Sequence, residues 1–408
     1  MSDSASKKPT GQYGHAKKLV TPVTPDELGE DLRSRISEVL RSVPGCSLRP
    51  TDLARTLDVS RVMVSRVLSS VAKESPTETL TSIPGPETLR SILRSAVNEG
   101  VLPETVELAM VSVDAFDTLI REDFGTRAAL NAALSVEHEG SRERFEQSSR
   151  YQVYKGMSQI FGVESKVWLT CSINTPNAEN DAKLDISTVL GASGLRKLRP
   201  DTPILLPMKD MPSHWRRNFP GRKEFDISQY CQHPPAPITP IEANGKIINT
   251  FTPETCSKKS VYDLISATYS PAAQDRNLDP EITRRGVSVT PMMPVASLIT
   301  DFIVHEDIYP GQTPELFVYN TNGSGSVHVL DPNWKINRLA TTDTVECLGT
   351  GLVNLDIPDV PGYTDMVRHV CAQTGYEPDV LRAYRVHVQY PVYGTQYMLA
   401  FKLCEQDD

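Results

Sequence analysis

The sequence lacks any long uninterrupted run of apolar residues. No stretch approaches the 18 or so apolar residues of a membrane-spanning helix, and the first 18 residues lack the apolar core of a signal peptide. The seven cysteines are odd in number and include no C-x-x-C pair, which favours reduced thiols over a disulfide framework. We therefore expect a cytoplasmic protein that does not bind a membrane.

Familiar catalytic and cofactor motifs are missing as well. The glycine-rich pieces Gly191–Gly194, Gly323–Gly325 and Gly349–Gly351 match neither a dinucleotide fingerprint nor a P-loop, and we interpret all three as turns. There is no H-E-x-x-H and no G-x-S-x-G. The group His305-Glu306-Asp307 with His328 is better explained by polar contacts at loop ends than by a metal. The sequence thus predicts no catalytic residues, no metal and no cofactor, and a protein that is not an enzyme.

Basic residues are too few overall for a typical nucleic-acid protein, since the net charge is −9. The distribution is uneven, however. Residues 1–75 carry 12 Lys and Arg against 9 Asp and Glu, a net of +3, and the remainder carries 30 against 42, a net of −12. This asymmetry is typical of a DNA-contacting head joined to a body that DNA would repel.

The most informative stretch runs from Arg49 to Ser70 (RPTDLARTLDVSRVMVSRVLSS) and contains two helix-length apolar patterns. Pro50 suits the first turn of the first helix, and Asp52 suits the positive field at that helix start. Ser60 is positioned to cap the second helix through its hydroxyl, with Val59 filling the angle between the helices. Upstream, Thr24-Pro25-Asp26-Glu27 forms a capping box before an amphipathic helix that ends at Pro44-Gly45.

Two short helices with a tight turn are typical of a helix-turn-helix, whose second helix enters the major groove. The segment DVSRVMVSRVL (58–68) resembles the recognition helix of LacI-type repressors, and its flanks resemble bacterial winged-helix regulators. The resemblance covers about 50 of the 408 residues, Thr24 to Lys73. It implies binding of double-stranded DNA by a homodimer that places two such helices on one site.

The residues expected to face DNA lie on the outer side of this motif. Arg61 and Arg66 are each suited to a phosphate or a guanine edge, and Ser65 is suited to a phosphate. Val62 and Met63 occupy positions that are often polar in such repressors, so either they contact thymine methyl groups or the specificity is looser. A helical domain for protein contact, with solvated arginines, remains the alternative. The predicted DNA-binding set is Arg49, Thr51, Ser60, Arg61, Val62, Ser65, Arg66 and Ser69.

Four segments are predicted along the chain. Residues 1–22 are polar and are predicted to be a disordered arm, and residues 23–82 form the helix-turn-helix domain. Within the latter, the stretch from Ser75 to Pro86 is either a wing strand or only a linker. Residues 83–162 show four amphipathic helical patterns and are predicted to be a linker or dimerisation segment.

Residues 163–408 contain short β-prone runs separated by proline-rich connections, which predicts a mixed α/β domain with a largely antiparallel sheet. In this domain Tyr363–Thr374 is a helix, and the run from Gln396 to Leu403 is expected to pair beside Arg382–Tyr390. The fold class is therefore α+β, with a winged or unwinged helical head.

The predicted function is a DNA-binding transcriptional regulator. Its C-terminal domain would sense a small-molecule effector or a partner and control the spacing of two heads. The alternative is an enzyme or assembly protein in which the head serves targeting or protein contact.

Overall fold

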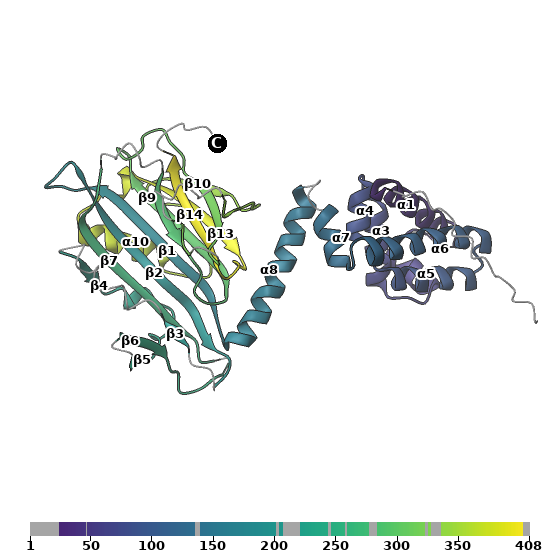
Figure 1. Cartoon of the computed structure of the whole chain (residues 1–408), viewed down its shortest axis with the longest axis horizontal. Coiled ribbons are helices and arrows are strands. Elements are labelled where there is room, and N and C mark those ends of the chain that lie inside the picture. Colours follow the sequence, from purple (N-terminus) through teal and green to yellow (C-terminus); the bar gives the residue numbers. More distant parts are fainter. Residues whose placement is uncertain are drawn as a thin grey trace, which may run out of the picture. The chain divides into compact units, whose positions relative to one another are not determined.

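The protein is described here from a computed structural model. Its described residues are 24–45, 47–134, 139–200, 204–206, 221–243, 246–257, 259–276, 284–322, 325–327 and 336–402, so the predicted arm at residues 1–22 lies outside them. The chain divides into two compact units, unit 1 (Met1–Phe145) and unit 2 (Glu146–Asp408) (Figure 1). Among the described helices, none has both the length and the apolar character needed to cross a membrane.

Unit 1 is helical. Proline occupies the first turn of five of its helices, where a missing N–H costs nothing. The predicted capping box is confirmed, because Thr24 Oγ1 accepts from the Glu27 N–H at 3.3 Å and Glu27 Oε2 accepts from the Thr24 N–H at 3.0 Å. Its helices are α1 Pro25–Arg41, α2 Pro50–Thr56, α3 Arg61–Val71, α4 Pro76–Ser82, α5 Pro86–Asn98, α6 Pro103–Thr118 with a π-helical turn Leu119–Asp123, and α7 Arg127–Leu134. The next helix, α8 Glu139–Phe161, begins in unit 1 and continues into unit 2.

A single hydrophobic core joins α1 to α7. It extends from Leu28 in α1 to Leu134 in α7, and it includes Leu89 and Ile92 of α5 and Phe116 of α6. The predicted boundary between residues 82 and 83 therefore falls inside this core. Helices that we expected to form a separate linker are part of the same packed unit, because their apolar faces are buried against α1 and α4.

The segment expected to be a wing strand or a linker is a helix instead. Residues 76–82 form α4, with the Ser75 side chain accepting from the Glu78 N–H at its start. Leu80 and the following Ile83 are buried in the unit 1 core. Burial of these two side chains outweighs the β propensity of the threonine-rich run, so this segment supplies no wing.

Unit 2 is built on a seven-stranded sheet in the order β12-β13-β9-β1-β2-β7-β4 (Figure 1). The sheet is antiparallel except for the β1–β9 pair, which is parallel. Its strands are β1 Val163–Pro176, β2 Lys183–Lys197, β4 Lys223–Phe225, β7 Tyr262–Asp275, β9 Val295–His305, β12 Val345–Thr350 and β13 Leu381–Gln389. The predicted mixed, largely antiparallel architecture is thus confirmed.

Two smaller sheets complete unit 2. One has the order β11-β10-β14-β8 and the other β3-β6-β5. Their strands are β3 Leu205–Leu206, β5 Ile238–Ala243, β6 Lys246–Phe251, β8 Arg284–Val289, β10 Glu315–Asn320, β11 Arg338–Leu339 and β14 Thr395–Lys402. Apolar residues of the four-stranded sheet share one core with one face of the large sheet, including Leu399, Phe401 and Phe302. The predicted helix α10 (Tyr363–Thr374) packs in a second core with the other face, through Tyr363 and Met366.

Two expectations about unit 2 are wrong. The run from Gln396 does not return beside β13, because β14 pairs with β10 and β8 while β13 pairs with β9 and β12. Gly191 to Gly194 is not a turn but lies within β2, where Gly191 allows the β7 backbone at Leu264 to approach closely. The turn predicted at Gly323–Gly325 lies partly outside the described residues.

Candidate nucleic-acid interface

The α2–turn–α3 segment is shaped by its local sequence. Val59 packs against the unit 1 core from the turn, as expected, and its N–H donates to the Ala54 carbonyl at 3.1 Å. Asp58 has a φ of 50°, a left-handed conformation that aspartate tolerates better than most residues. Ser60 precedes α3 but makes no side-chain capping hydrogen bond, so the expected cap is absent.

The inner sides of α2 and α3 are fixed by burial. Leu53 and Leu57, on the α2 side, and Val64 and Val67 of α3 are all buried in the core that contains α1. Leu68 is only half-buried at the edge of this core. This packing leaves the opposite side of α3 on the surface.

The outer side of α3 carries the predicted contact residues. Arg61, Ser65, Arg66 and Ser69 are exposed, and Val62 is 77% exposed. Arg49, Thr51 and Ser60 are also exposed around the starts of α2 and α3. The structure therefore leaves all eight predicted residues accessible.

Several of these side chains have no competing contacts. Within the described part of the chain, the side chains of Arg49, Arg61 and Ser65 form no hydrogen bond or ion pair. Ser69 Oγ donates to the Arg66 carbonyl at 3.1 Å. Arg66 Nε donates to the Ser82 carbonyl at 3.4 Å, a long and exposed contact.

Arg127 of α7 was not identified from the sequence, although it lies at the same edge of α3. Its Nη2 donates to the carbonyls of Leu80 and Ile83 at the end of α4, at 3.0 Å for Ile83. Burial, together with the positive charge of Arg66, lowers the pKa of Arg127 to about 10. Two arginines therefore repel each other here, and an anion near Arg66 would relieve that repulsion.

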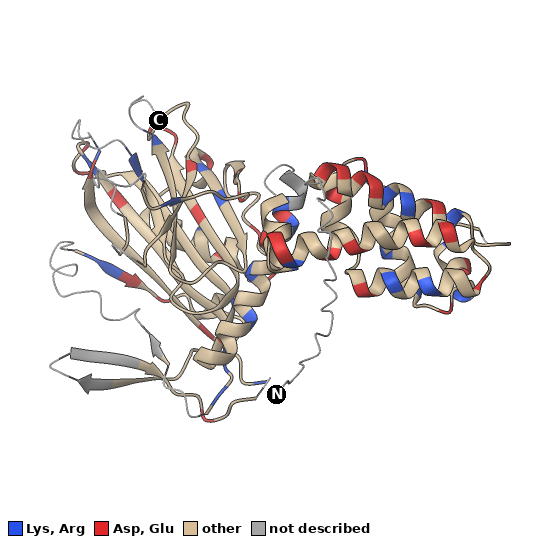
Figure 2. Ribbon diagram, turned by 45° about the vertical axis from the view of Figure 1, so that its right-hand side comes forward, with Lys and Arg blue, Asp and Glu red and all other residues tan. Residues whose placement is uncertain are grey.

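Charge in the head is divided between its helices. Residues 24–75 carry 8 basic and 8 acidic residues, so the excess of +3 seen over residues 1–75 belongs to residues 1–23. Within 24–75, the span 49–66 has four arginines against two aspartates, while α1 has five acidic residues against three arginines. Figure 2 shows basic and acidic residues interspersed along the helices of unit 1. Between residues 24 and 75, the positive excess lies in the α2–α3 segment.

Unit 2 contains buried carboxylates that sequence reasoning also missed. Asp301 of β9 accepts both Arg385 Nε and Nη2 at 2.8 Å and the Tyr363 hydroxyl at 2.7 Å. Burial raises the pKa of the Tyr363 hydroxyl well above its usual value, and the negative charge of Asp301 raises it further. Because each group has its partners inside the fold, the cluster joins β9, β13 and α10 and offers no free ligand atom.

A second buried carboxylate, Asp185 of β2, has four donors around it. It accepts from Asn177 Nδ2, the hydroxyls of Tyr269 and Tyr376, and the backbone N–H of Ala272, at 2.6–2.8 Å. Burial raises the pKa of both tyrosines, and their hydrogen bonds to Asp185 act in the same direction. The arrangement ties β2, β7 and the end of α10 together.

Unit 2 also contains a hydroxyl–imidazole pair. Ser297 Oγ and His387 Nε2 lie 2.7 Å apart on neighbouring strands. In the described residues no carboxylate orients this histidine, so the third member of a hydrolytic triad is not seen. The described residues also contain no cluster of three potential metal ligands, and His328 lies outside them.

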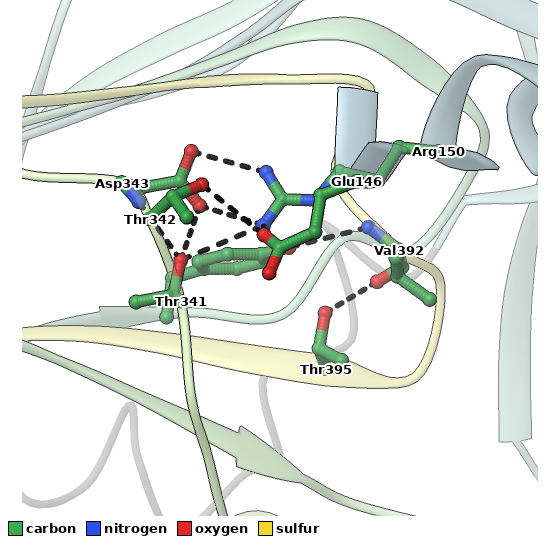
Figure 3. A network of polar contacts seen from close by, with 8 residues as sticks. Glu146, Arg150, Thr341, Thr342, Asp343, Val392 and Thr395 are labelled. Carbon is green, nitrogen blue, oxygen red and sulfur yellow. Dashed lines mark hydrogen bonds and ion pairs between the residues drawn. The ribbon is translucent and has the colours of Figure 1, made fainter. Parts of the chain in front are cut away.

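The C-terminal part of α8 belongs to unit 2. Arg150 donates to Asp343 Oδ1 at 3.0 Å, and Glu146 accepts from Thr342 at 3.1 Å (Figure 3). Tyr154 packs against Tyr390 with the two rings tilted by 38° and their centroids 5.2 Å apart. The segment that we predicted to end at residue 162 as a linker is therefore partly fixed to the sheet domain.

No protein-family model, no curated protein and no solved structure matches this chain. The function of the α2–α3 surface must therefore be inferred from the geometry and chemistry of its own residues.

Proposed function

We propose that this protein is a DNA-binding transcriptional regulator in which α2 and α3 form a helix-turn-helix and α3 enters the major groove of double-stranded DNA. The observation that carries the proposal is the outer side of α3, where Arg61 and its neighbours are exposed, while the inner side is buried in the core. Arginine beside small hydroxyl side chains on an exposed helix suits base edges and phosphates.

The charge distribution favours a dimer. Residues 24–75 carry no net charge, and the excess of the α2–α3 segment is only two arginines, so one head neutralises few phosphates and binds weakly at physiological salt. Two heads on one palindromic site, about 34 Å apart, would bind much more strongly. Unit 2 would then bind an effector or partner. This ligand would favour one spacing of the two heads because it binds more tightly to the protein in that spacing than in the other.

The test is a selection from randomised DNA duplexes with the full chain, followed by fluorescence anisotropy on the enriched duplex. We expect enriched sites with two inverted half-sites about one helical turn apart. Arg61→Ala should weaken binding by about 1–3 kcal/mol if Arg61 contacts a base edge. Arg94→Ala is the matched control, because Arg94 is an exposed arginine of α5 that also has no partner among the described residues.

Two outcomes would contradict the proposal. One is a selection that enriches no sequence and a chain that binds no duplex. The other is that Arg61→Ala binds the enriched duplex as tightly as the wild type does, while circular dichroism shows that both proteins are folded. In either case the α3 surface would serve protein contact or targeting instead.

A further inference from the structure

The first turn of α3 presents apolar side chains to the surface. Val62 is 77% exposed and Met63 is 38% exposed, and neither belongs to the unit 1 core. Their neighbours Arg61 and Ser65 are polar and exposed. Val62 therefore has no packing role that would explain an apolar residue at this position.

The position of Val62 within the helix limits what it can contact. It is the second residue of α3, and residues near the start of a recognition helix are those that reach base edges. The thymine C5 methyl is the apolar group that the major groove offers there. A valine in a helix keeps essentially one side-chain rotamer, so it loses little conformational freedom on contact.

We infer that α3 recognises thymine methyl groups in the major groove through Val62, with Met63 adjacent to the same contact; this inference rests on the proposed function. Arg61 and Ser65 then supply the polar contacts on either side. The ligand is a duplex with at least one thymine opposite the first turn of α3. Specificity at that base pair comes from apolar contact, so it does not require a hydrogen bond.

Replacement of thymine by uracil isolates this contact, because uracil keeps the same base pairing and hydrogen-bonding groups and lacks only the methyl. Each thymine of the selected duplex is replaced in turn by deoxyuridine, and binding of the full chain is measured by fluorescence anisotropy. Burial of one methyl group corresponds to about a fourfold change in affinity. We expect about a fourfold loss at one or two positions per half-site and none at the others.

Two valine variants assign the effect to a side chain. Val62→Ala should bind the thymine duplex more weakly than wild type and should no longer distinguish thymine from uracil at those positions. Val111→Ala is the matched control, since Val111 is a 68% exposed valine of α6, away from the α2–α3 segment. It should keep the full wild-type discrimination.

The outcomes separate this inference from the proposed function. Absence of binding to any duplex overturns the proposed function and this inference with it. Binding that is indifferent to uracil at every position overturns the inference and leaves DNA binding intact. A uracil effect that persists in Val62→Ala also overturns it, because the methyl would then be sensed elsewhere or through DNA shape.

Discussion

Gly29 in the interior of α1 lies against Pro76, the first residue of α4. A Cβ at this position would lie 2.3 Å from the Pro76 carbonyl oxygen and 2.7 Å from its carbonyl carbon. Carbon–oxygen contacts are normally about 3.3 Å or longer, so the two helices would have to separate by about 1 Å. Gly29→Ala therefore tests the packing of α4 on α1 directly.

Two effects of this substitution oppose each other. Alanine in a helix interior is favoured over glycine by about 1 kcal/mol. Overpacking of a close contact costs about 1–3 kcal/mol, and the upper part of that range applies because backbone atoms cannot rotate away. We expect Gly29→Ala to reduce the free energy of unfolding by about 1–2 kcal/mol.

Gly156→Ala in α8 provides the matched control. It is also a glycine within a helix, but a Cβ there meets no atom within 4 Å. The propensity effect then acts alone and should stabilise the helix by up to about 1 kcal/mol. The two substitutions are chemically identical, but they should change the free energy of unfolding in opposite directions.

The measurement is urea unfolding of the full chain by circular dichroism, with amide hydrogen exchange to locate the change, since two units need not unfold in one transition. Protection should fall in α1 and α4 for Gly29→Ala and rise in α8 for Gly156→Ala. If Gly29→Ala stabilises the protein as Gly156→Ala does, residues 76–82 do not lie against α1 and the helical placement of this segment is wrong.

Two further predictions concern buried and half-buried carboxylates. Arg90 donates to Asp117 at 2.9 Å, and this hydrogen bond lowers the pKa of the Asp117 carboxyl in the folded protein. The ionised carboxylate therefore stabilises the fold at pH values above its unfolded pKa of about 3.9. This stabilisation is lost as the pH falls through the lower pKa that Asp117 has in the folded protein. Asp117→Asn should therefore be less stable than wild type at pH 7, by a margin that shrinks below about pH 4; an equal margin at pH 7 and pH 3 would contradict this. In unit 2, Asp185→Ala removes the shared acceptor of four donors and should cost about 3–5 kcal/mol in urea unfolding. The control is Asp181→Ala, at a side chain that is 96% exposed, which should change the free energy of unfolding by less than about 0.5 kcal/mol. Similar losses in Asp185→Ala and Asp181→Ala would show that the Asp185 cluster does not form.

Local sequence signals were sufficient for helices α1, α2 and α3. The capping box at Thr24, the prolines at helix starts and the apolar spacing of Leu53, Leu57 and Val64 depend only on residues within one or two turns. The outer face of α3 could be predicted for the same reason, since a period of 3.6 residues fixes which side chains oppose the buried ones.

The sequence was misleading where a segment was short and its partners were distant. Residues 76–82 carry a β-prone threonine run, and only burial of Leu80 beneath neighbouring helices makes them α4. The domain boundary predicted at residue 82 is wrong for the same reason, because apolar residues of α5 and α6 are buried in the same core as those of α1. Nor could the sequence place Arg127, a residue 61 positions from Arg66, at the edge of α3.

In unit 2 the sequence determined that strands exist but not how they pair. The alternation in β13 and β14 indicated two strands, and proximity in sequence favoured a hairpin, yet the structure puts them in different sheets. β2 and β7 were missed, although Leu184, Ile186 and Thr188 alternate with a period of two. Hydrophobic periodicity is a local property of the chain, whereas sheet order depends on which apolar faces can be buried together, and only the tertiary structure decides that.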